Sequence, residues 1–270
     1  MSLSAGRIAL VASAIHLLTC APAAPRSGTG APAVEAKAPL VLTAAVCDGP
    51  YEQLEAQIVE LVNARRRRAG LAPLTHSLRL AQAAEQRSIA MAAAGQLGHR
   101  VDRRSPSQRV RESGYRFTAL AENLAFRARS AGEAVEGWIG SPGQRANLLS
   151  AAFTQTGVGV ACDRWGQPYL TQLIALPRSP ERDDLPELQF ALRNSTAAPA
   201  HIEIEGSALA LRLEPDASVS FTASYLAVEP RVTVEAGGRR TVFAPKDGGD
   251  YRLVRTSAGR FAVVADGPRP

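Results

Sequence analysis

The sequence predicts an α+β protein in which an α-β-α layered domain precedes a small, sandwich-like all-β domain. Residues 50–177 mix helix and strand patterns, whereas residues 187–266 contain almost only strand patterns. The composition agrees with packed domains, because 46% of the residues are hydrophobic and 21% are charged. A length of 270 residues is enough for two ordinary domains.

The first two helices are predicted from apolar spacing and from their end signals. The first ends in four consecutive arginines, residues 65–68, with Gly70 as its stop. The second runs from about Ser77 to Ala94, and Gly95 closes it. The arginines allow two interpretations, a nucleic-acid patch or cations that complement the dipole at a helix C-terminus. We favour the second, because the chain also carries an export signal.

Capping residues predict two more helices. A short helix has Ser105 as its cap, Pro106 at its first position and Gly114 just past its end. The next helix begins at Ser130, where Glu133 completes a capping box.

A fifth helix is predicted to begin in the stretch SPGQRANLL, residues 141–149. Ser141 is a favourable N-cap and Pro142 suits the first helical position. Gln144 stands where a capping box has Glu or Gln. A second interpretation places Gln144 at the rim of a functional site.

Strand patterns follow the fifth helix. Residues 156–161 and 169–175 predict two strands joined by a turn that contains glycine. Farther along, Ile202 and Ile204 alternate with Glu203, and similar alternation recurs between turn signals up to residue 266. Seven or eight short strands at this spacing predict a β-sandwich, and none of them carries a catalytic motif.

The N-terminus predicts export. Arg7 precedes an apolar run, residues 8–19, that is too short to span a bilayer as a helix. Ala21-Pro22-Ala23 offers a cleavage site, so residues 1–23 are expected to be a signal peptide. Alternatively, residues 17–20 form a lipoprotein signal, in which Cys20 would carry lipid. The protein is therefore expected to be secreted or periplasmic, with anchoring through Cys20 as the alternative.

The expected organisation after the signal has three parts. Residues 24–46 are rich in Ala and Pro and form a tether. Residues 47–178 form the layered domain, and a charged linker, residues 179–186, leads to the β-domain at 187–266.

The cysteines and the net charge indicate the compartment in which the protein works and the class of its partners. Cys20 is removed or lipidated under either form of export, which leaves Cys47 and Cys162 as a pair in an oxidising compartment. We predict a disulfide between them, with two buried free thiols as the alternative. The net charge of +6 suits an anionic envelope surface, and export argues against nucleic acid as a partner.

The common catalytic signatures are absent from the sequence, including G-x-S-x-G, H-E-x-x-H, the P-loop and the dinucleotide fingerprint. Among the histidines, His76 precedes a helix cap, His201 lies on the polar side of a strand, and His99 follows a helix in QLGHR. Glu122 lies inside the apolar run ALAENLAF, where a carboxylate needs a partner. His99 is the natural candidate for that partner, although a single histidine is more often structural.

With these motifs in hand, the layered domain resembles the CAP superfamily (cysteine-rich secretory proteins, antigen 5 and pathogenesis-related proteins) in its bacterial SCP-domain form. The matching stretches occur in family order and cover about half of the chain. They are LVNARRRRAGLAPL (61–74), LAQAAEQRSIAMAAAGQLGH (80–99), SPSQRVRESGY (105–115), AENLAF (121–126), VEGWIGSPGQRANLL (135–149), FTQTGVGVAC (153–162) and YLTQLIA (169–175).

The resemblance implies an α-β-α sandwich with a shallow cleft, lined by two histidines and acidic residues that hold zinc in some members. The first histidine matches His99, and the glutamate of the GEN motif matches Glu122, although Ala121 replaces the glycine. The second histidine is replaced by Gln144. A neutral amide is a poor zinc ligand, so we expect no cofactor, with a weak zinc site at His99 and Glu122 as the alternative.

The chain differs from the family pattern at one further position and matches it at three others. A second acidic residue would fall just after Trp138, where this chain has Ile139, and Glu133 and Glu136 are the nearby carboxylates. Three amide side chains match family positions, and we interpret them as structural hydrogen-bonding groups. They are Asn123, Asn147 and Gln172.

Three functions are compatible with these residues. The favoured one is a non-catalytic binding module at the cell envelope, with a lipid, glycan or protein ligand, as the resemblance implies. The second is a hydrolase with His99 as general base, Glu122 orienting it and Gln144 polarising a carbonyl, although no nucleophile is apparent. The third is a structural envelope protein that keeps only a relict of the cleft.

Overall fold

The computed structural model describes residues 47–99, 101–180, 185–207, 209–225 and 228–266. The expected signal peptide, the tether and Cys20 therefore lie outside the described residues. Five α-helices occur in the described part of the chain: α1 (Tyr51–Arg68), α2 (Leu78–Ala94), α3 (Pro106–Glu112), α4 (Ala131–Gly140) and α5 (Pro142–Leu148). None of the described helices is long and apolar enough to cross a membrane.

Serine caps begin three of these helices as predicted. The side chains of Ser77, Ser105 and Ser130 each accept a hydrogen bond from a main-chain N–H in the first turn of α2, α3 and α4. At the end of α2, Gly95 adopts the left-handed conformation that closes a helix.

The strands form one sheet of eight and one of four. The first has the order β1-β3-β4-β2-β8-β5-β11-β12 and the second the order β10-β9-β6-β7. Their bounds are β1 (Thr75–His76), β2 (Phe117–Phe126), β3 (Gln155–Cys162), β4 (Pro168–Pro177), β5 (Glu187–Asn194), β6 (Ala200–Ile204), β7 (Ala210–Leu213), β8 (Ser218–Ser224), β9 (Val232–Ala236), β10 (Arg239–Phe243), β11 (Gly249–Arg255) and β12 (Phe261–Ala265).

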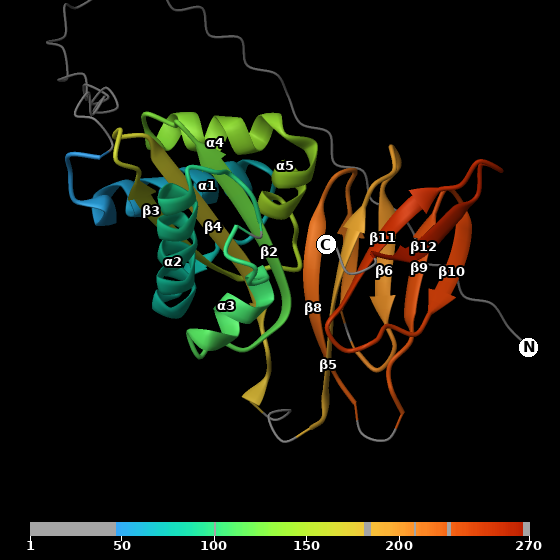
Figure 1. Cartoon of the computed structure of the whole chain (residues 1–270). Helices are drawn as coiled ribbons and strands as arrows, with labels where there is room; N and C mark the ends of the chain where they lie inside the picture. Colours follow the sequence, from blue (N-terminus) through green and yellow to red (C-terminus); the bar gives the residue numbers. More distant parts are fainter. Residues whose placement is uncertain (1–46, 100, 181–184, 208, 226–227, 267–270) are drawn as a thin grey trace, which may run out of the picture. The chain divides into compact units, whose positions relative to one another are not determined.

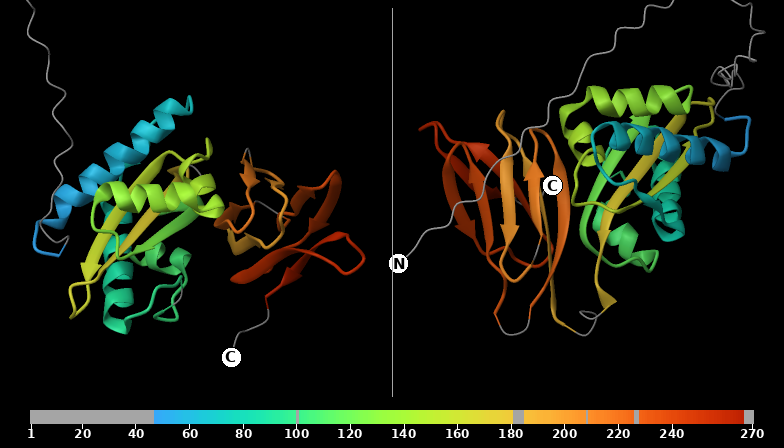
Figure 2. Two further views of the ribbon diagram at one scale, coloured as in Figure 1. Left: turned by 90° about the horizontal axis from the view of Figure 1, so that it is seen from above. Right: turned by 180° about the vertical axis from the view of Figure 1, so that it is seen from behind.

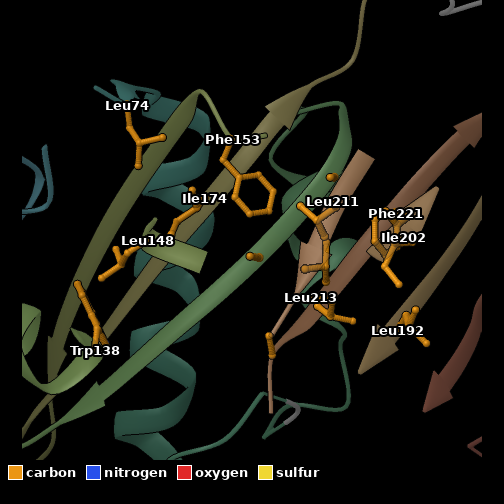
Figure 3. Close-up of a cluster of buried hydrophobic side chains, with 14 of the residues drawn as sticks. Leu74, Trp138, Leu148, Phe153, Ile174, Leu192, Ile202, Leu211, Leu213 and Phe221 are labelled. Carbon is orange, nitrogen blue, oxygen red and sulfur yellow. The ribbon is translucent and has the colours of Figure 1, made fainter. Parts of the chain in front are cut away.

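Helices cover both faces of the sheet formed by β1, β3, β4 and β2 (Figure 1; Figure 2). On one face, Val62 of α1 and Trp138 of α4 pack with Ile174 of β4 in one buried cluster (Figure 3). On the other face, Leu80 of α2 and Val110 of α3 share a separate cluster with strand residues such as Leu173. Because Leu173 and Ile174 are neighbours in β4, the two-residue period of a strand divides the cores. The predicted α-β-α layering is confirmed.

The C-terminal strands alternate as predicted but are not all set apart from the layered domain. β6, β7, β9 and β10 form a separate antiparallel sheet, whereas β8 pairs with β2 through the register Ala119 to Phe221 and Ala121 to Val219. In the first half of β2, the main-chain groups on the side away from β4 pair with β8. One layer of the expected sandwich is thus a continuation of the sheet of the layered domain.

One local prediction is wrong and another is confirmed with an addition. The side chain of Ser141 makes no cap hydrogen bond at the start of α5, so the predicted capping box does not form. The four arginines lie in the last turn of α1 as predicted, and Arg66 among them is buried. Its guanidinium donates to the carbonyls of Ala72, in the loop after α1, and of Leu148 and Ser150, at and just past the end of α5.

The predicted disulfide is confirmed. Cys47 and Cys162 are bonded, with their Cα atoms 5.9 Å apart. The bond therefore ties the residues just before α1 to the last residue of β3.

Candidate functional site

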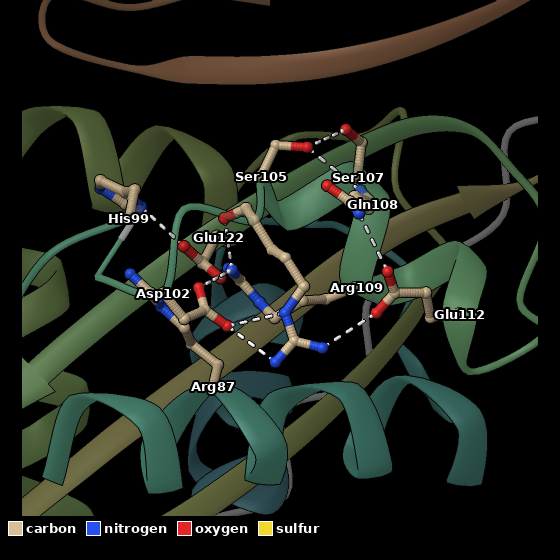
Figure 4. A network of polar contacts seen from close by, with 10 residues as sticks. Arg87, His99, Asp102, Ser105, Ser107, Gln108, Arg109, Glu112 and Glu122 are labelled. Atoms are coloured by element: carbon tan, nitrogen blue, oxygen red, sulfur yellow. Dashed lines mark hydrogen bonds and ion pairs between the residues drawn. The ribbon is translucent and has the colours of Figure 1, made fainter. Parts of the chain in front are cut away.

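The predicted partnership between His99 and Glu122 is confirmed. Glu122 lies in the middle of β2 and its side chain is 3% exposed, whereas the side chain of His99, in the segment after α2, is 57% exposed. His99 Nδ1 lies 2.7 Å from Glu122 Oε1 (Figure 4). A buried carboxylate thus holds one nitrogen of an imidazole whose ring reaches solvent.

Arginines complete the site, and sequence reasoning missed them. Arg109 of α3 is 1% exposed, and its Nη2 donates to Glu122 Oε2 at 3.1 Å. The second nitrogen of the same guanidinium donates to Asp102 Oδ1 at 3.2 Å, as does Arg87 of α2. Asp102 also accepts from Arg104. Two buried guanidiniums therefore share two carboxylates in one network (Figure 4).

A signal for these arginines exists in the sequence. Arg87 follows Ala83 and Ala84 and precedes Met91 at helical spacing, on the face that packs against the sheet. An arginine on such a face needs a polar partner, and the carboxylate of Asp102 is that partner for Arg87.

The network keeps its carboxylates ionised. Burial alone would raise the pKa of Glu122, but the hydrogen bond and charge of His99, followed by the charges of Arg109 and Arg87, outweigh it and lower that pKa. Burial likewise opposes ionisation of Asp102, yet the charge of Arg109 and the hydrogen bond from Arg104 lower its pKa. Both acids are therefore charged near neutral pH.

Gln144 borders the same strand but does not join the pair. Its Oε1 accepts the main-chain N–H of Leu124 at 2.9 Å, and Asn123 donates its side-chain amide to the Gln144 carbonyl. β8 pairs with β2 only at residues 119–121, so the N–H of Leu124 needs another acceptor. Gln144 thus ties α5 to β2, which replaces the capping role predicted for it.

The other candidate residues lie elsewhere or act structurally. Glu133 binds Arg129 next to the start of α4, and Glu136 pairs with Arg65 of α1, so neither carboxylate contacts His99 or Glu122. His76 and His201 are exposed on β1 and β6. The three amides form a buried chain, in which Asn147 donates to Asn123 and Asn123 to Gln172.

The donor set does not fit a zinc ion. Among the described residues, no group of three His, Cys, Asp or Glu side chains is placed to hold a metal. At Glu122, both carboxylate oxygens are already bonded, one of them to a guanidinium that would repel a second cation. Gln144, at the position of the second family histidine, is bonded to the main chain.

Comparison with known proteins assigns the layered domain to a family. Residues 59–173 match the model of the cysteine-rich secretory protein family, CAP. Two Bacillus subtilis proteins, the uncharacterized protein YkwD and the uncharacterized membrane protein YlbC, are each 32% identical over 48% of this chain. The matches cover 49% and 39% of those proteins, so the chain spans half of their length or less.

Two solved structures are similar to the same part of the chain. A Bacillus anthracis extracellular protein containing a SCP domain is 28% identical, with a TM-score of 0.44 over 46% of this chain and 41% of that one. An outer surface protein of Borrelia burgdorferi is 18% identical, with a TM-score of 0.41 over 47% of this chain and 92% of that one. Residues 59–173 of this chain are therefore a CAP domain, which matches the model of the cysteine-rich secretory protein family.

Proposed function

We propose that this protein is an exported, non-catalytic binding module that works at an anionic surface of the cell envelope. The predicted export signal and the net charge of +6 support this function. The disulfide supports it as well, because disulfides persist in oxidising compartments outside the cytosol. A relative described as a membrane protein, YlbC, is 32% identical over 48% of this chain.

The observation that carries the non-catalytic part is the internal bonding of the candidate site residues. Glu122 is 3% exposed and binds His99 with one oxygen and Arg109 with the other. The side-chain oxygen of Gln144 accepts a main-chain N–H. Glu122 and Gln144 therefore hold segments of the fold together, and neither is set as a nucleophile beside His99.

Cosedimentation of the full chain with lipid vesicles tests the proposal. We expect binding to vesicles that contain phosphatidylglycerol, weaker binding to pure phosphatidylcholine, and loss of the difference at high salt. His99→Ala should lower the stability of the protein and leave vesicle binding unchanged. Failure to bind anionic vesicles at low salt would overturn the proposal.

A second candidate function, hydrolysis, is favoured by one observation, the His99–Glu122 pair itself. A carboxylate on Nδ1 orients an exposed imidazole so that its other nitrogen can act as a general base. Hydrolysis of p-nitrophenyl acetate by the full chain, compared with His99→Ala, tests this role. Turnover that disappears in the variant would overturn the non-catalytic part of the proposal.

A further inference from the structure

The connection between β3 and β4 presents an exposed tryptophan on a fixed turn. Asp163 Oδ1 accepts the N–H groups of Trp165 and Gln167 at 2.9 and 2.8 Å, which sets the turn. Trp165 is 64% exposed, and the guanidinium of Arg164 lies 4.0 Å from the centre of its ring. A large aromatic side chain is thus held in solvent, although nothing in the turn requires one.

A second arginine–aromatic pair lies at the same end of the sheet. Phe126, the last residue of β2, pairs in register with Tyr169 at the start of β4. The guanidinium of Arg127 lies 4.9 Å from the centre of the Phe126 ring, and the Arg127 N–H donates to Pro168. Arg127 has a φ of 62°, an uncommon conformation for a residue with a side chain. Two adjacent connections therefore each carry an arginine over an aromatic ring.

Cys47 lies at this end of the sheet. It is bonded to Cys162, three residues before Trp165, and the start of α1 lies at the same end of the sheet as the β3–β4 connection (Figure 1). The sequence before Cys47 contains the apolar run 8–19 and Cys20. Attachment of the chain to a membrane through Cys20 or the apolar run would therefore tether this end of the sheet to the bilayer.

We propose that the hairpin surface, defined as Phe126, Arg127, Arg164 and Trp165, docks on an anionic lipid bilayer. Tryptophan favours the boundary between headgroups and acyl chains, because its ring is apolar and its N–H is polar. Arginine pairs with lipid phosphates through its planar guanidinium while it stays stacked on an aromatic ring. This inference rests on the envelope role proposed above and names the surface and the partner for it.

The charges around the hairpin surface restrict how it docks. Asp48 and Glu52 are exposed at the start of α1. The carboxylate of Asp163 accepts two main-chain N–H groups of the turn. The bilayer therefore meets the connection after β2 and the β3–β4 connection, which carry Arg127 and Arg164, rather than the start of α1.

The two tryptophans of the chain provide a local test. Trp138 is fully buried, so a change in emission on adding vesicles reports on Trp165. With full-length protein and phosphatidylglycerol-containing vesicles, we expect a shift to shorter wavelength and quenching by lipids brominated near the headgroup. Trp165→Ala should remove both signals and weaken binding about tenfold.

Matched variants separate binding by this surface from non-specific binding by other parts of the protein. Leu78 is 66% exposed at the opposite end of α2, and Leu78→Ala should leave binding unchanged. Arg127→Gly and Arg164→Gln should weaken binding to anionic vesicles, whereas Arg67→Gln, at the exposed end of α1, should not.

The outcomes distinguish this proposal from the broader function. Vesicle binding with no change in Trp165 emission would overturn the hairpin surface and leave the envelope function standing. No binding to any vesicle would overturn both. An equal emission change with phosphatidylcholine alone would overturn the requirement for anionic lipid.

Discussion

Arg109 and Glu122 form a buried ion pair, with Arg109 Nη2 3.1 Å from Glu122 Oε2 and both side chains at most 3% exposed. Replacing Arg109 by Met keeps most of the side-chain volume but leaves Glu122 facing a smaller positive charge. We expect the free energy of unfolding to fall by about 3–5 kcal/mol, because one uncompensated charge stays buried. Urea denaturation followed by circular dichroism measures this loss.

A double-mutant cycle shows whether the pair itself is responsible. Arg109→Met combined with Glu122→Gln should destabilise by less than the sum of the single variants. Arg129→Gln is a matched control, because that arginine pairs with Glu133 at the surface and should change stability little. Additive effects of Arg109→Met and Glu122→Gln would contradict the coupling.

Glu55 predicts a pH dependence of the opposite sign to that of Glu122. Burial, together with the charge of Glu85, raises the pKa of Glu55 to about 7. The folded state holds this proton more tightly than the unfolded state, so its contribution to stability is full below about pH 4.5 and is lost as the pH rises through 7. Glu55→Gln should stabilise the protein by about 2 kcal/mol at pH 8 and leave it unchanged at pH 4.

Thermal unfolding at both pH values checks the Glu55 prediction. Glu85→Gln is the control for the electrostatic part and should give a smaller gain at pH 8, because burial is the larger cause of the shift. The same gain at pH 4 and pH 8 would show that the pKa of Glu55 is not the cause.

The helices and the site pair could be predicted because their signals are local or physically forced. Ser77 and Gly95 mark the ends of α2 within a few residues of sequence. Glu122 needed a partner because it lies in an apolar strand, and His99 was the nearest histidine outside a regular element. In both cases the type of the residue left few alternative roles for it.

The remaining features depend on contacts between distant segments. Gln144 fits a capping box by its sequence position, but the unpaired N–H of Leu124 on another element takes its side chain. Arg66 cannot be told from its three arginine neighbours by sequence, because the carbonyls that bury it, those of Leu148 and Ser150, lie more than 80 residues away. The pairing of β2 with β8 likewise joins distant segments. The alternation of apolar and polar residues predicts a strand but does not indicate which strand it pairs with.

The disulfide should contribute strongly to stability. It closes a loop with a sequence separation of 115 residues, so it removes many conformations from the unfolded chain. Cys47→Ser together with Cys162→Ser should lower the free energy of unfolding by about 3–5 kcal/mol. Thermal unfolding of the wild type with and without reductant is the control, and an equal melting temperature in both conditions would contradict the prediction.

Restoring a histidine at position 144 should not restore a metal site. Gln144→His supplies an imidazole, but Arg109 still holds one oxygen of Glu122 and keeps a positive charge beside it. Calorimetric titration with zinc should give no binding heat for the wild type or for Gln144→His. Micromolar binding by either protein that disappears with His99→Ala would show that the guanidinium does not exclude the cation.

Helix α2 should depend on the absence of a side chain at Gly159. A Cβ atom on Gly159 would collide with the backbone of Glu85 in α2, where no flexible side chain can move aside. Ser88 of the same helix donates to the Gly159 carbonyl at 2.8 Å, so the close approach is also held by a hydrogen bond. Gly159→Ala should therefore force α2 away from β3 and destabilise the protein by about 2–4 kcal/mol.

Gly137→Ala is the matched control for this prediction. Gly137 lies in α4, and a Cβ there would meet no atom within 4 Å. The same chemical change should stabilise the protein by about 0.5–1 kcal/mol, because alanine loses less backbone entropy in a helix. Urea denaturation of both variants measures the contrast in sign. A stable Gly159→Ala protein with Ser88 still protected from hydrogen exchange would show that the helix can shift without losing its packing.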